Sequence, residues 1–408
     1  MRAHANISSM HNAGAGLLRW GAEALAAIAL LALVGSAHAA PIKLGFINSL
    51  TGPGALVGEA AQAGVEFAVK EINEQGGIAG RPLELIVADD QTNPTSGVNE
   101  AKRLIQQVKI DVLVGPAYSQ VTLASMPLLA RAKIASINGS GIEKLTPEIA
   151  PYSFSNLVSS DAQAAMIVDY VKTHLKASSV AIISDTGAQA KVAVAAMTKS
   201  LEANEVRIAG VQDYQYGTAD MTPQLMHLRR NKPDALILFA TTGDDTGHVL
   251  KGLEEMGWDI AVAGSYGTSL AEAGIKIAGK AAYRNLAGVN YAAWAYCKEG
   301  TLPERNRQLI EGLQQLRPNV ASRLPFNYVS LWYDSVYLLK NAIEGTGGST
   351  DGPTIARWIE ENAHSFTGIS SKLNASASNH FLIGENNLAM IKPSERSAEG
   401  MQKRVDCP

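Results

Sequence analysis

Short apolar segments alternate with amphipathic helices along most of this chain, and this alternation restricts the possible folds more than any other feature. Apolar segments without polar alternation are buried on both faces, as in parallel sheets covered by helices. In the first part of the chain the expected strands are 42–47, 82–88, 110–114 and 134–137. The segments between them carry apolar residues at helical spacing, for example at 61, 65, 68, 69 and 72. The sequence therefore predicts an α/β lobe with a doubly wound parallel sheet.

The pattern then restarts and predicts a second α/β lobe of similar size. After a strand near 152–154, the expected strands are 180–183, 206–211, 235–239 and 260–263, with helices between them. The remainder has a strand at 286–291 and helices at 303–316, 326–343 and 353–362, which we expect to pack on the first lobe. The chain would then cross between lobes near 157–160, 284–290 and 368–374. Several crossovers make a hinge, and a hinge implies a cleft that closes.

These boundaries divide the chain into four parts. We expect 40–158 with 288–370 to form lobe one, and 159–287 with 371–394 to form lobe two. Residues 1–39 are expected to be a signal peptide, and 395–408 a C-terminal tail. A mature chain of about 369 residues exceeds one ordinary core, which agrees with two lobes.

The N-terminal segment predicts export. Arg2 and Arg19 precede an apolar run at 24–34, which ends in small residues. Ala37-His38-Ala39 fits the small-x-small rule for signal peptidase, so cleavage is expected after Ala39. The run is too short for a spanning helix, which needs about 20 residues. No cysteine lies directly beside the expected cleavage site, so the sequence predicts an exported, periplasmic protein without a lipid anchor.

Charge and cysteine content narrow the class of protein further. Without the signal peptide the chain has 33 basic and 37 acidic side chains, which argues against nucleic-acid and acidic-lipid partners. The only two cysteines, Cys297 and Cys407, form an even pair in an oxidising compartment, so we expect one disulfide. It would tie the C-terminus to the body of the protein. We expect no cofactor and a monomer.

Ligands of open parallel sheets bind at the carboxyl ends of strands. Three loops of lobe one leave such strand ends, at 48–57, 115–120 and 138–142, and they are rich in Gly, Ser, Thr, Asn and Pro. Ser119 begins a helix, where its hydroxyl and free backbone N–H groups can donate to an anion. Gly139, Ser140 and Gly141 let backbone approach a ligand closely. The last two loops lack Arg and Lys, which favours a small carboxylate held by neutral donors over a phosphate.

Several segments resemble the branched-chain amino-acid-type periplasmic solute-binding proteins of ABC transporters. The resemblance extends in order over nearly all of the mature chain, and it implies a type I periplasmic binding protein fold. It is specific for the family and not for the ligand. The segments that carry it are 42–47, 50–53, 68–73, 76–85, 89–91 and 275–279.

The resemblance also implies positions for the ligand site. The family binds the ligand's α-carboxylate and α-ammonium mainly from lobe one, and its serine after the third strand falls on Ser119. The loop after the fourth strand falls on Gly139, Ser140 and Gly141. A lobe-two tyrosine that closes on the ligand falls near Thr242, and the acidic residue that pairs with the ammonium falls at or next to Tyr266. The predicted ligand-binding residues are Leu56, Tyr118, Ser119, Gly139, Ser140, Gly141, Thr242 and Tyr266.

The residues at 242 and 266 depart from the family pattern. A buried ammonium needs a negative partner, since an unpaired buried charge costs several kcal/mol, and Tyr266 cannot supply one. Asp244 or Asp245 are candidates from the neighbouring loop, although either could instead be a helix N-cap before Gly247. In the alternative interpretation the ligand has no ammonium, and Tyr118 and Tyr266 flank a flat or aromatic carboxylate.

Other functional signals are weak. The segment 274–281 nearly matches a P-loop, but Ala281 stands where Mg²⁺ needs a hydroxyl, and a helix precedes it. No Gly-x-Ser-x-Gly motif occurs, and no mature histidine has a metal-ligand partner at the required spacing, so we expect neither enzyme nor metal site. The sequence predicts the solute-binding component of an ABC uptake transporter, which passes its ligand to a membrane permease. The alternative is a periplasmic sensor that feeds a separate membrane receptor.

Overall fold

The computed structural model describes Met1 and residues 40–407, apart from 299, 301 and 319–323. Residues 41–408 make one compact unit, and the fold below refers to it. The predicted signal peptide and its cleavage site fall on residues outside the described range. Among the described residues, no helix combines the length and apolar character that crossing a membrane requires.

The first sheet has five parallel strands in the order β2-β1-β3-β4-β5. Its interior strand β1 carries Ile42, Leu44 and Phe46, each at most 1% exposed, because helices cover both faces of the sheet. The strands are β1 (Ile42–Asn48), β2 (Leu83–Asp89), β3 (Val112–Val114), β4 (Ala135–Asn138) and β5 (Ser153–Ser155).

The second sheet has eight strands in the order β11-β13-β12-β10-β9-β8-β6-β7. Strands β6 to β10 run parallel, whereas β12 pairs antiparallel with both β10 and β13. The predicted α/β class with two parallel sheets is confirmed, and the antiparallel C-terminal strands were not predicted. The strands are β6 (Ser179–Asp185), β7 (Arg207–Tyr214), β8 (Ala235–Phe239), β9 (Ala261–Gly264), β10 (Leu286–Tyr291), β11 (Ala295–Tyr296), β12 (Leu388–Arg396) and β13 (Gln402–Arg404).

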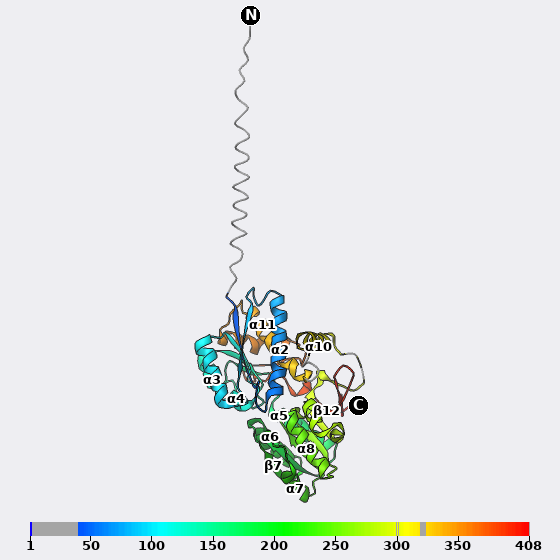
Figure 1. Cartoon of the computed structure of the whole chain (residues 1–408). Coiled ribbons are helices and arrows are strands. Elements are labelled where there is room, and N and C mark those ends of the chain that lie inside the picture. Colours follow the sequence, from blue (N-terminus) through cyan, green and yellow to red (C-terminus); the bar gives the residue numbers. More distant parts are fainter. Residues whose placement is uncertain (2–39, 299, 301, 319–323, 408) are drawn as a thin grey trace. The chain divides into compact units, whose positions relative to one another are not determined.

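The described α-helices cover these sheets and lie in two groups (Figure 1). The group around the first sheet includes α2, α3, α4 and α11, and the group around the second includes α6, α7 and α8. The helices are α2 (Ala55–Glu74), α3 (Pro94–Arg103), α4 (Ser119–Ala132), α5 (Ser160–Thr173), α6 (Ala188–Ala203), α7 (Thr222–Arg230), α8 (Gly243–Glu255), α9 (Ala271–Ala278), α10 (Glu304–Leu316), α11 (Phe326–Gly345) and α12 (Gly352–Asn362). Short 3₁₀ segments include η2 (Tyr266–Ser269), which follows β9.

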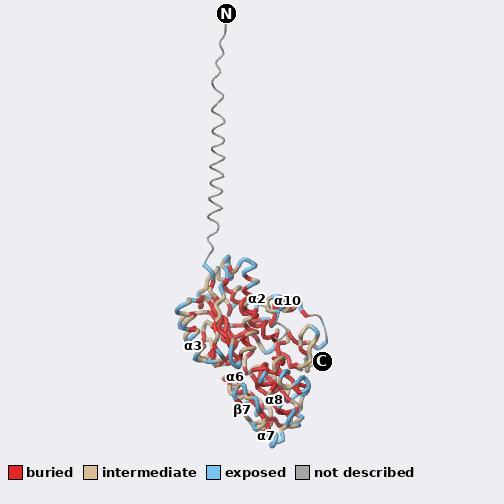
Figure 2. The backbone as a smooth tube through the Cα atoms, viewed as in Figure 1, coloured by how far each residue is buried: buried red, intermediate tan, exposed pale blue. Residues whose placement is uncertain are grey.

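Buried residues run through the interior of both groups, and exposed residues lie on the outer helix faces (Figure 2). The late helix α11 returns to the first group, because it packs against α2. Phe67 of α2 stacks on Tyr333 of α11 with ring centroids 5.9 Å apart, and the Tyr333 hydroxyl donates to Glu71 at 2.7 Å. The boundaries between the two predicted lobes stay a prediction.

Buried polar groups fix segments late in the chain, including one of the segments predicted to cross between the lobes. Asp334 of α11 accepts hydrogen bonds from the backbone N–H groups of Ile369 and Ser370, at 2.9 and 2.7 Å, and from the Ser370 hydroxyl. Burial raises the pKa of Asp334 to about 6, although these hydrogen bonds act in the opposite direction. Because a buried carboxylate is costly without such partners, it holds the segment near 369 at one place.

A second buried network joins α11 to the C-terminal strands. The Asn327 amide donates to Ser269 and to Asn290, at 3.2 and 2.9 Å, and Asn290 donates to Gln402 at 2.6 Å. Gln402 in turn donates to the Ser269 carbonyl at 2.9 Å. The network therefore links a helix of the first group, two strands of the second sheet and the end of η2.

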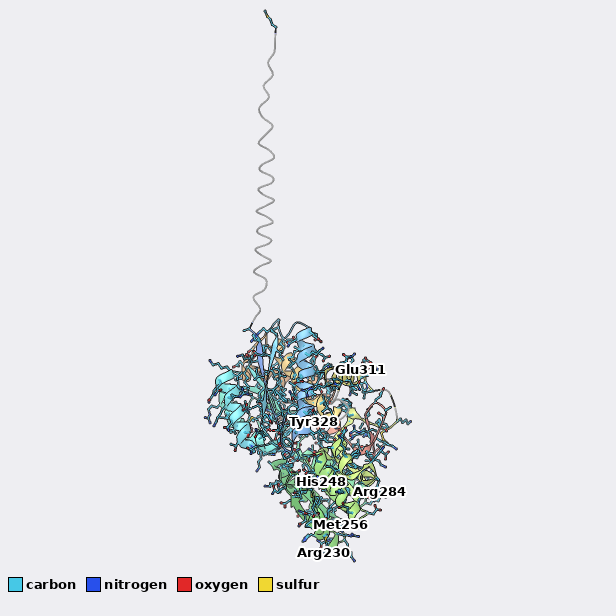
Figure 3. All side chains as sticks on the ribbon, in the orientation of Figure 1. Arg230, His248, Met256, Arg284, Glu311 and Tyr328 are labelled. Carbon is cyan, nitrogen blue, oxygen red and sulfur yellow. A yellow bond between two sulfur atoms is a disulfide. The ribbon has the colours of Figure 1, made fainter. Side chains whose placement is uncertain are left out.

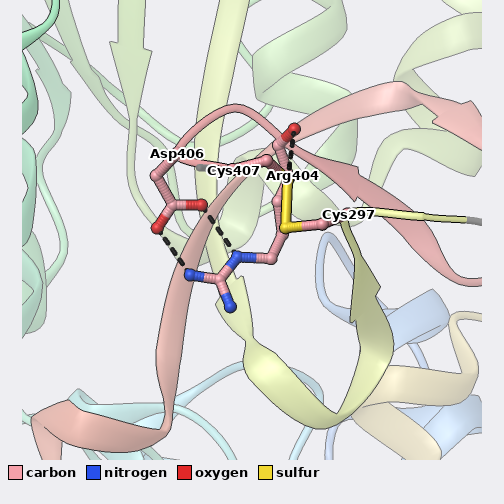
Figure 4. Close-up of a disulfide and its surroundings, with 4 residues drawn as sticks. All are labelled: Cys297, Arg404, Asp406 and Cys407. Carbon is pink, nitrogen blue, oxygen red and sulfur yellow. Dashed lines mark hydrogen bonds and ion pairs between the residues drawn. A yellow bond between two sulfur atoms is a disulfide. The ribbon is translucent and has the colours of Figure 1, made fainter.

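A disulfide joins Cys297 and Cys407 across 110 residues, with the Cα atoms 5.4 Å apart (Figure 4). The two cysteines follow β11 and β13, which pair in parallel, with Ala295 opposite Gln402. An ion pair between Arg404 and Asp406 lies beside the disulfide. The C-terminal segment is thereby tied to the edge of the second sheet.

We expect the double variant Cys297→Ser/Cys407→Ser to lose about 2–4 kcal/mol of unfolding free energy, since closing a long loop restricts the unfolded chain. Urea unfolding with and without dithiothreitol measures the difference. The reductant should destabilise the wild type and leave the double variant unchanged. Equal stability of wild type and variant under oxidising conditions would contradict a closed disulfide.

Candidate functional site

A pocket with about 510 Å³ of empty space lies where segments from both sheets meet. Loops after β3, β4, β8 and β9 reach it, as expected for the carboxyl ends of parallel strands. We call the wall built from residues before 160 and from α11 the first-sheet side, and the opposite wall the second-sheet side. The polar and aromatic lining residues are Tyr118, Ser119, Gln120, Gln163, Gln189, Tyr216, Phe239, Thr241, Ser265, Tyr266 and Tyr328.

Ser119 on the first-sheet side presents a hydrogen-bond donor. It begins α4, whose N-terminus has no side-chain cap, so backbone N–H groups of the first turn face the same region. The Ser119 oxygen accepts from the Ser140 hydroxyl at 3.1 Å, and the Ser140 oxygen accepts from the Ile142 N–H at 3.4 Å. The Ser119 proton is therefore left to donate into the pocket.

The predicted ligand-binding residues occupy three different places. Tyr118, Ser119, Gly139 and Tyr266 line the pocket. Ser140 and Gly141 lie behind it: Ser140 is fully buried and positions Ser119, and a Cβ on Gly141 would lie 2.1 Å from the Gln189 amide nitrogen.

Leu56 and Thr242 line a smaller adjoining space of about 290 Å³, together with Val57 and Leu270. Thr242 is the N-cap of α8, and its hydroxyl oxygen accepts from the Asp245 N–H at 3.1 Å. The expectation that Asp244 or Asp245 could be an N-cap is therefore wrong, because α8 begins earlier and both lie in its first turn.

Aromatic rings form much of the lining and pair across it. Tyr118 meets Tyr216 edge-on with centroids 6.3 Å apart, and Tyr266 stacks on Tyr328 at 6.3 Å. Each pair joins the first-sheet side to the second-sheet side, and Figure 3 places Tyr328 near the region where the two groups meet. The buried hydroxyls of Tyr118 and Tyr266 have no partner among the described residues, so a ligand could satisfy them.

No Asp, Glu, Lys, Arg or His is among the described residues that line this pocket. Two carboxylates lie behind its second-sheet side. Asp185, at the end of β6, is 1% exposed, and burial raises its pKa to about 6. Burial also raises the pKa of Asp245, which accepts from the Gly217 N–H at 3.0 Å and whose second oxygen has no described partner.

The set of predicted ligand-binding residues missed seven polar lining residues: Gln120, Gln163, Gln189, Tyr216, Thr241, Ser265 and Tyr328. Thr241 and Gln189 follow the ends of β8 and β6, so the strand-end rule that identified Ser119 could also have identified them. Tyr328 comes from α11, far along the chain, and no local pattern connects it to the pocket.

Comparison with known proteins agrees with this architecture. A family model for periplasmic binding proteins matches residues 41–397. The chain belongs to the periplasmic binding protein family.

Its relatives are of the branched-chain amino-acid type. The Leu/Ile/Val-binding protein BraC3 of Rhizobium johnstonii is 26% identical over 342 residues, which cover 82% of this chain and 87% of the relative. The Leu/Ile/Val-binding protein homolog 3 of Brucella melitensis is 25% identical, with coverage of 83% and 88%. The predicted membership in this family is confirmed.

Solved structures of this family share the fold. LivJ of Streptococcus pneumoniae, a branched-chain amino acid transporter substrate-binding protein in complex with isoleucine, has a TM-score of 0.76 and 22% identity, covering 90% of this chain and 99% of LivJ. A Rhodopseudomonas palustris solute-binding protein in complex with 4-hydroxybenzoate has a TM-score of 0.76 and 18% identity, with coverage of 89% and 95%.

The raised pKa of Asp185 predicts a specific dependence of stability on pH. Its stabilising contribution is present below the unfolded value of 3.8 and is lost as pH rises through about 6, because the folded protein then carries a buried charge. Between pH 4 and pH 7.5 we expect Asp185→Asn to gain on the order of 1–3 kcal/mol relative to wild type. Urea unfolding at several pH values measures this trend.

Asp234 gives a control of opposite sign. Hydrogen bonds from Ser178 and Ser179 lower the pKa of this exposed carboxyl, so its contribution is present above the unfolded value and is lost on acidification. Because this window lies below about pH 4, the difference in unfolding free energy between Asp234→Asn and wild type should stay nearly constant between pH 4 and pH 7.5. If the difference in unfolding free energy between Asp185→Asn and wild type stayed constant across this pH range, the raised pKa assigned to Asp185 would be contradicted.

Proposed function

We propose that this protein captures a small carboxylate without an α-ammonium in the pocket between the two sheets, and delivers it to the permease of an ABC transporter. The observation that carries the proposal is the donor set at the N-terminus of α4, in a pocket whose described lining has no charged side chain. Backbone N–H groups at a helix N-terminus and the Ser119 proton suit a carboxylate.

The described lining residues include no acidic side chain, and this argues against an α-amino acid as the ligand. In an α-amino acid the ammonium and the carboxylate are bonded to the same carbon. With the carboxylate at Ser119, the ammonium would therefore also lie close to Ser119 on the first-sheet side. The described lining residues there include Val57, Ala117, Tyr118 and Gly139, and none carries a negative charge. Leaving an ammonium unpaired after desolvation costs several kcal/mol.

The aromatic lining favours a flat body for the ligand. Tyr118, Tyr216, Phe239, Tyr266 and Tyr328 surround the pocket, and rings stacked against a flat ligand gain both burial and favourable ring contacts. Relatives in the family include proteins named for leucine, isoleucine and valine, and the Rhodopseudomonas palustris neighbour holds an aromatic carboxylate. The family therefore includes members with either class of ligand.

The proposal extends to location and mode of action. We infer an exported, monomeric periplasmic protein, cleaved after Ala39, whose two lobes close on the ligand without turnover. Ser119 has no histidine beside it among the described lining residues, so no activated nucleophile supports catalysis there.

A thermal-shift screen of the exported, purified protein tests the ligand class with matched pairs. We expect 3-phenylpropanoate and benzoate to stabilise the protein and phenylalanine and leucine to have no effect. A ligand at 100 times its dissociation constant adds about 2.7 kcal/mol of stability. Stabilisation by the amino acids alone would show that the ammonium has a partner, and would contradict the proposed class.

Ser119→Ala removes a donor to the carboxylate, so we expect it to weaken binding of the best carboxylate by about 1–3 kcal/mol. Titration calorimetry measures the affinity. Ser96→Ala, in the first turn of α3 and outside the pocket, is the matched control and should bind as wild type does. Unchanged affinity for Ser119→Ala would disprove the placement of the carboxylate.

A further inference from the structure

The hydroxyl of Tyr216 on the second-sheet side has its proton committed to the protein. It donates to the Thr241 hydroxyl oxygen at 3.3 Å. The Thr241 hydroxyl has a single proton, which it donates to Asp185 Oδ2 at 2.8 Å. Thr241 can therefore only accept from Tyr216, and the relay from Tyr216 through Thr241 to Asp185 runs in one direction.

Asp185 is fixed as the acceptor at the end of this relay. Its Oδ2 also accepts from the Thr241 N–H, and its Oδ1 accepts from the Gly187 N–H, both at 2.8 Å. An ionised carboxylate has no proton to donate, so it cannot reverse the direction of the relay. Asp185 is a positioning residue, because it acts on the pocket only through Thr241 and Tyr216.

Gly187 leaves the space in which these groups meet. A Cβ at this position would lie 2.1 Å from the Tyr216 oxygen and 2.7 Å from Asp185 Oδ1. The phenol oxygen of Tyr216 and the carboxylate of Asp185 therefore both lie close to Gly187. Any larger residue at position 187 would push Tyr216 away.

From these hydrogen bonds we infer that the ligand carries a hydrogen-bond donor, a hydroxyl or an amine, which donates to the oxygen of Tyr216. Tyr216 lines the pocket opposite Ser119, with its proton already used. The oxygen of Ser119 is engaged and its proton is free, whereas the proton of Tyr216 is engaged and its oxygen is free. The two walls therefore select opposite hydrogen-bonding groups. This inference rests on the proposed function, which places the carboxylate at Ser119.

Four benzoates test the inference by calorimetry: benzoate, 4-hydroxybenzoate, 4-methoxybenzoate and 4-aminobenzoate, whose aromatic amine is neutral at pH 7. We expect a ligand with a donor to bind about tenfold more tightly than benzoate and 4-methoxybenzoate, since a hydrogen bond in a buried site contributes on this scale. Tighter binding of the hydroxyl or of the amino compound supports the inference and identifies the kind of donor.

Tyr216→Phe removes the acceptor. We expect it to reduce the preference for the donor-bearing ligand over benzoate to less than about threefold. Tyr170→Phe, whose hydroxyl lies outside this pocket, is the matched control and should keep the wild-type preference. If Tyr216→Phe does not fold, Gly187→Ala tests the same step, because the added methyl group displaces the Tyr216 oxygen.

The outcomes separate the inference from the function on which it rests. If the benzoates bind with equal affinity, the inference is overturned and carboxylate capture stands. If 4-methoxybenzoate binds most tightly, Tyr216 is a donor and the inference is also overturned. If no carboxylate binds and Ser119→Ala has no effect on any ligand found, the proposed function fails, and the inference fails with it.

Discussion

The structure depends on one constraint: polar groups at the carboxyl ends of the strands must find partners in or around a largely aromatic pocket. A buried donor or acceptor without a partner costs about 1–3 kcal/mol, so each such group is either bonded within the protein or directed at a ligand. Ser140 is bonded and holds Ser119, whereas Ser119 keeps a free proton. The bonded groups fix the geometry, and the unbonded ones define what the pocket can recognise.

The sequence predicted the parts of this arrangement that depend on local pattern. Alternating apolar segments predicted the parallel sheets, and the loop after β3 predicted Ser119 because ligands of open parallel sheets bind at the carboxyl ends of strands. The antiparallel strands β12 and β13 follow no such alternation, and their place in the second sheet depends on distant pairing of β12 with β10 and of β13 with β11. Tyr328 could not be predicted either, because the return of α11 to α2 brings it to the pocket.

The C-terminal strands also bear on the pocket. The disulfide holds β13 against β11, and Gln402 of β13 bonds the Ser269 carbonyl at the end of η2. That short helix begins at Tyr266, which lines the pocket. These contacts tie η2, and with it Tyr266 of the pocket lining, to the C-terminal strands.

A pocket without charged lining residues must discriminate by the direction of its hydrogen bonds. A charged lining residue would attract many ions of opposite sign, whereas a neutral donor stabilises only a ligand that has an acceptor at the matching position. Asp185 shows how charge can still contribute from behind the wall. Asp185 is not among the described residues that line this pocket. By accepting the Thr241 proton it leaves Thr241 able only to accept from Tyr216, and Tyr216 can then act only as an acceptor toward the ligand. The buried charge thereby makes a neutral group an acceptor, and it does so from a position where it does not form a salt bridge with cations that enter the pocket.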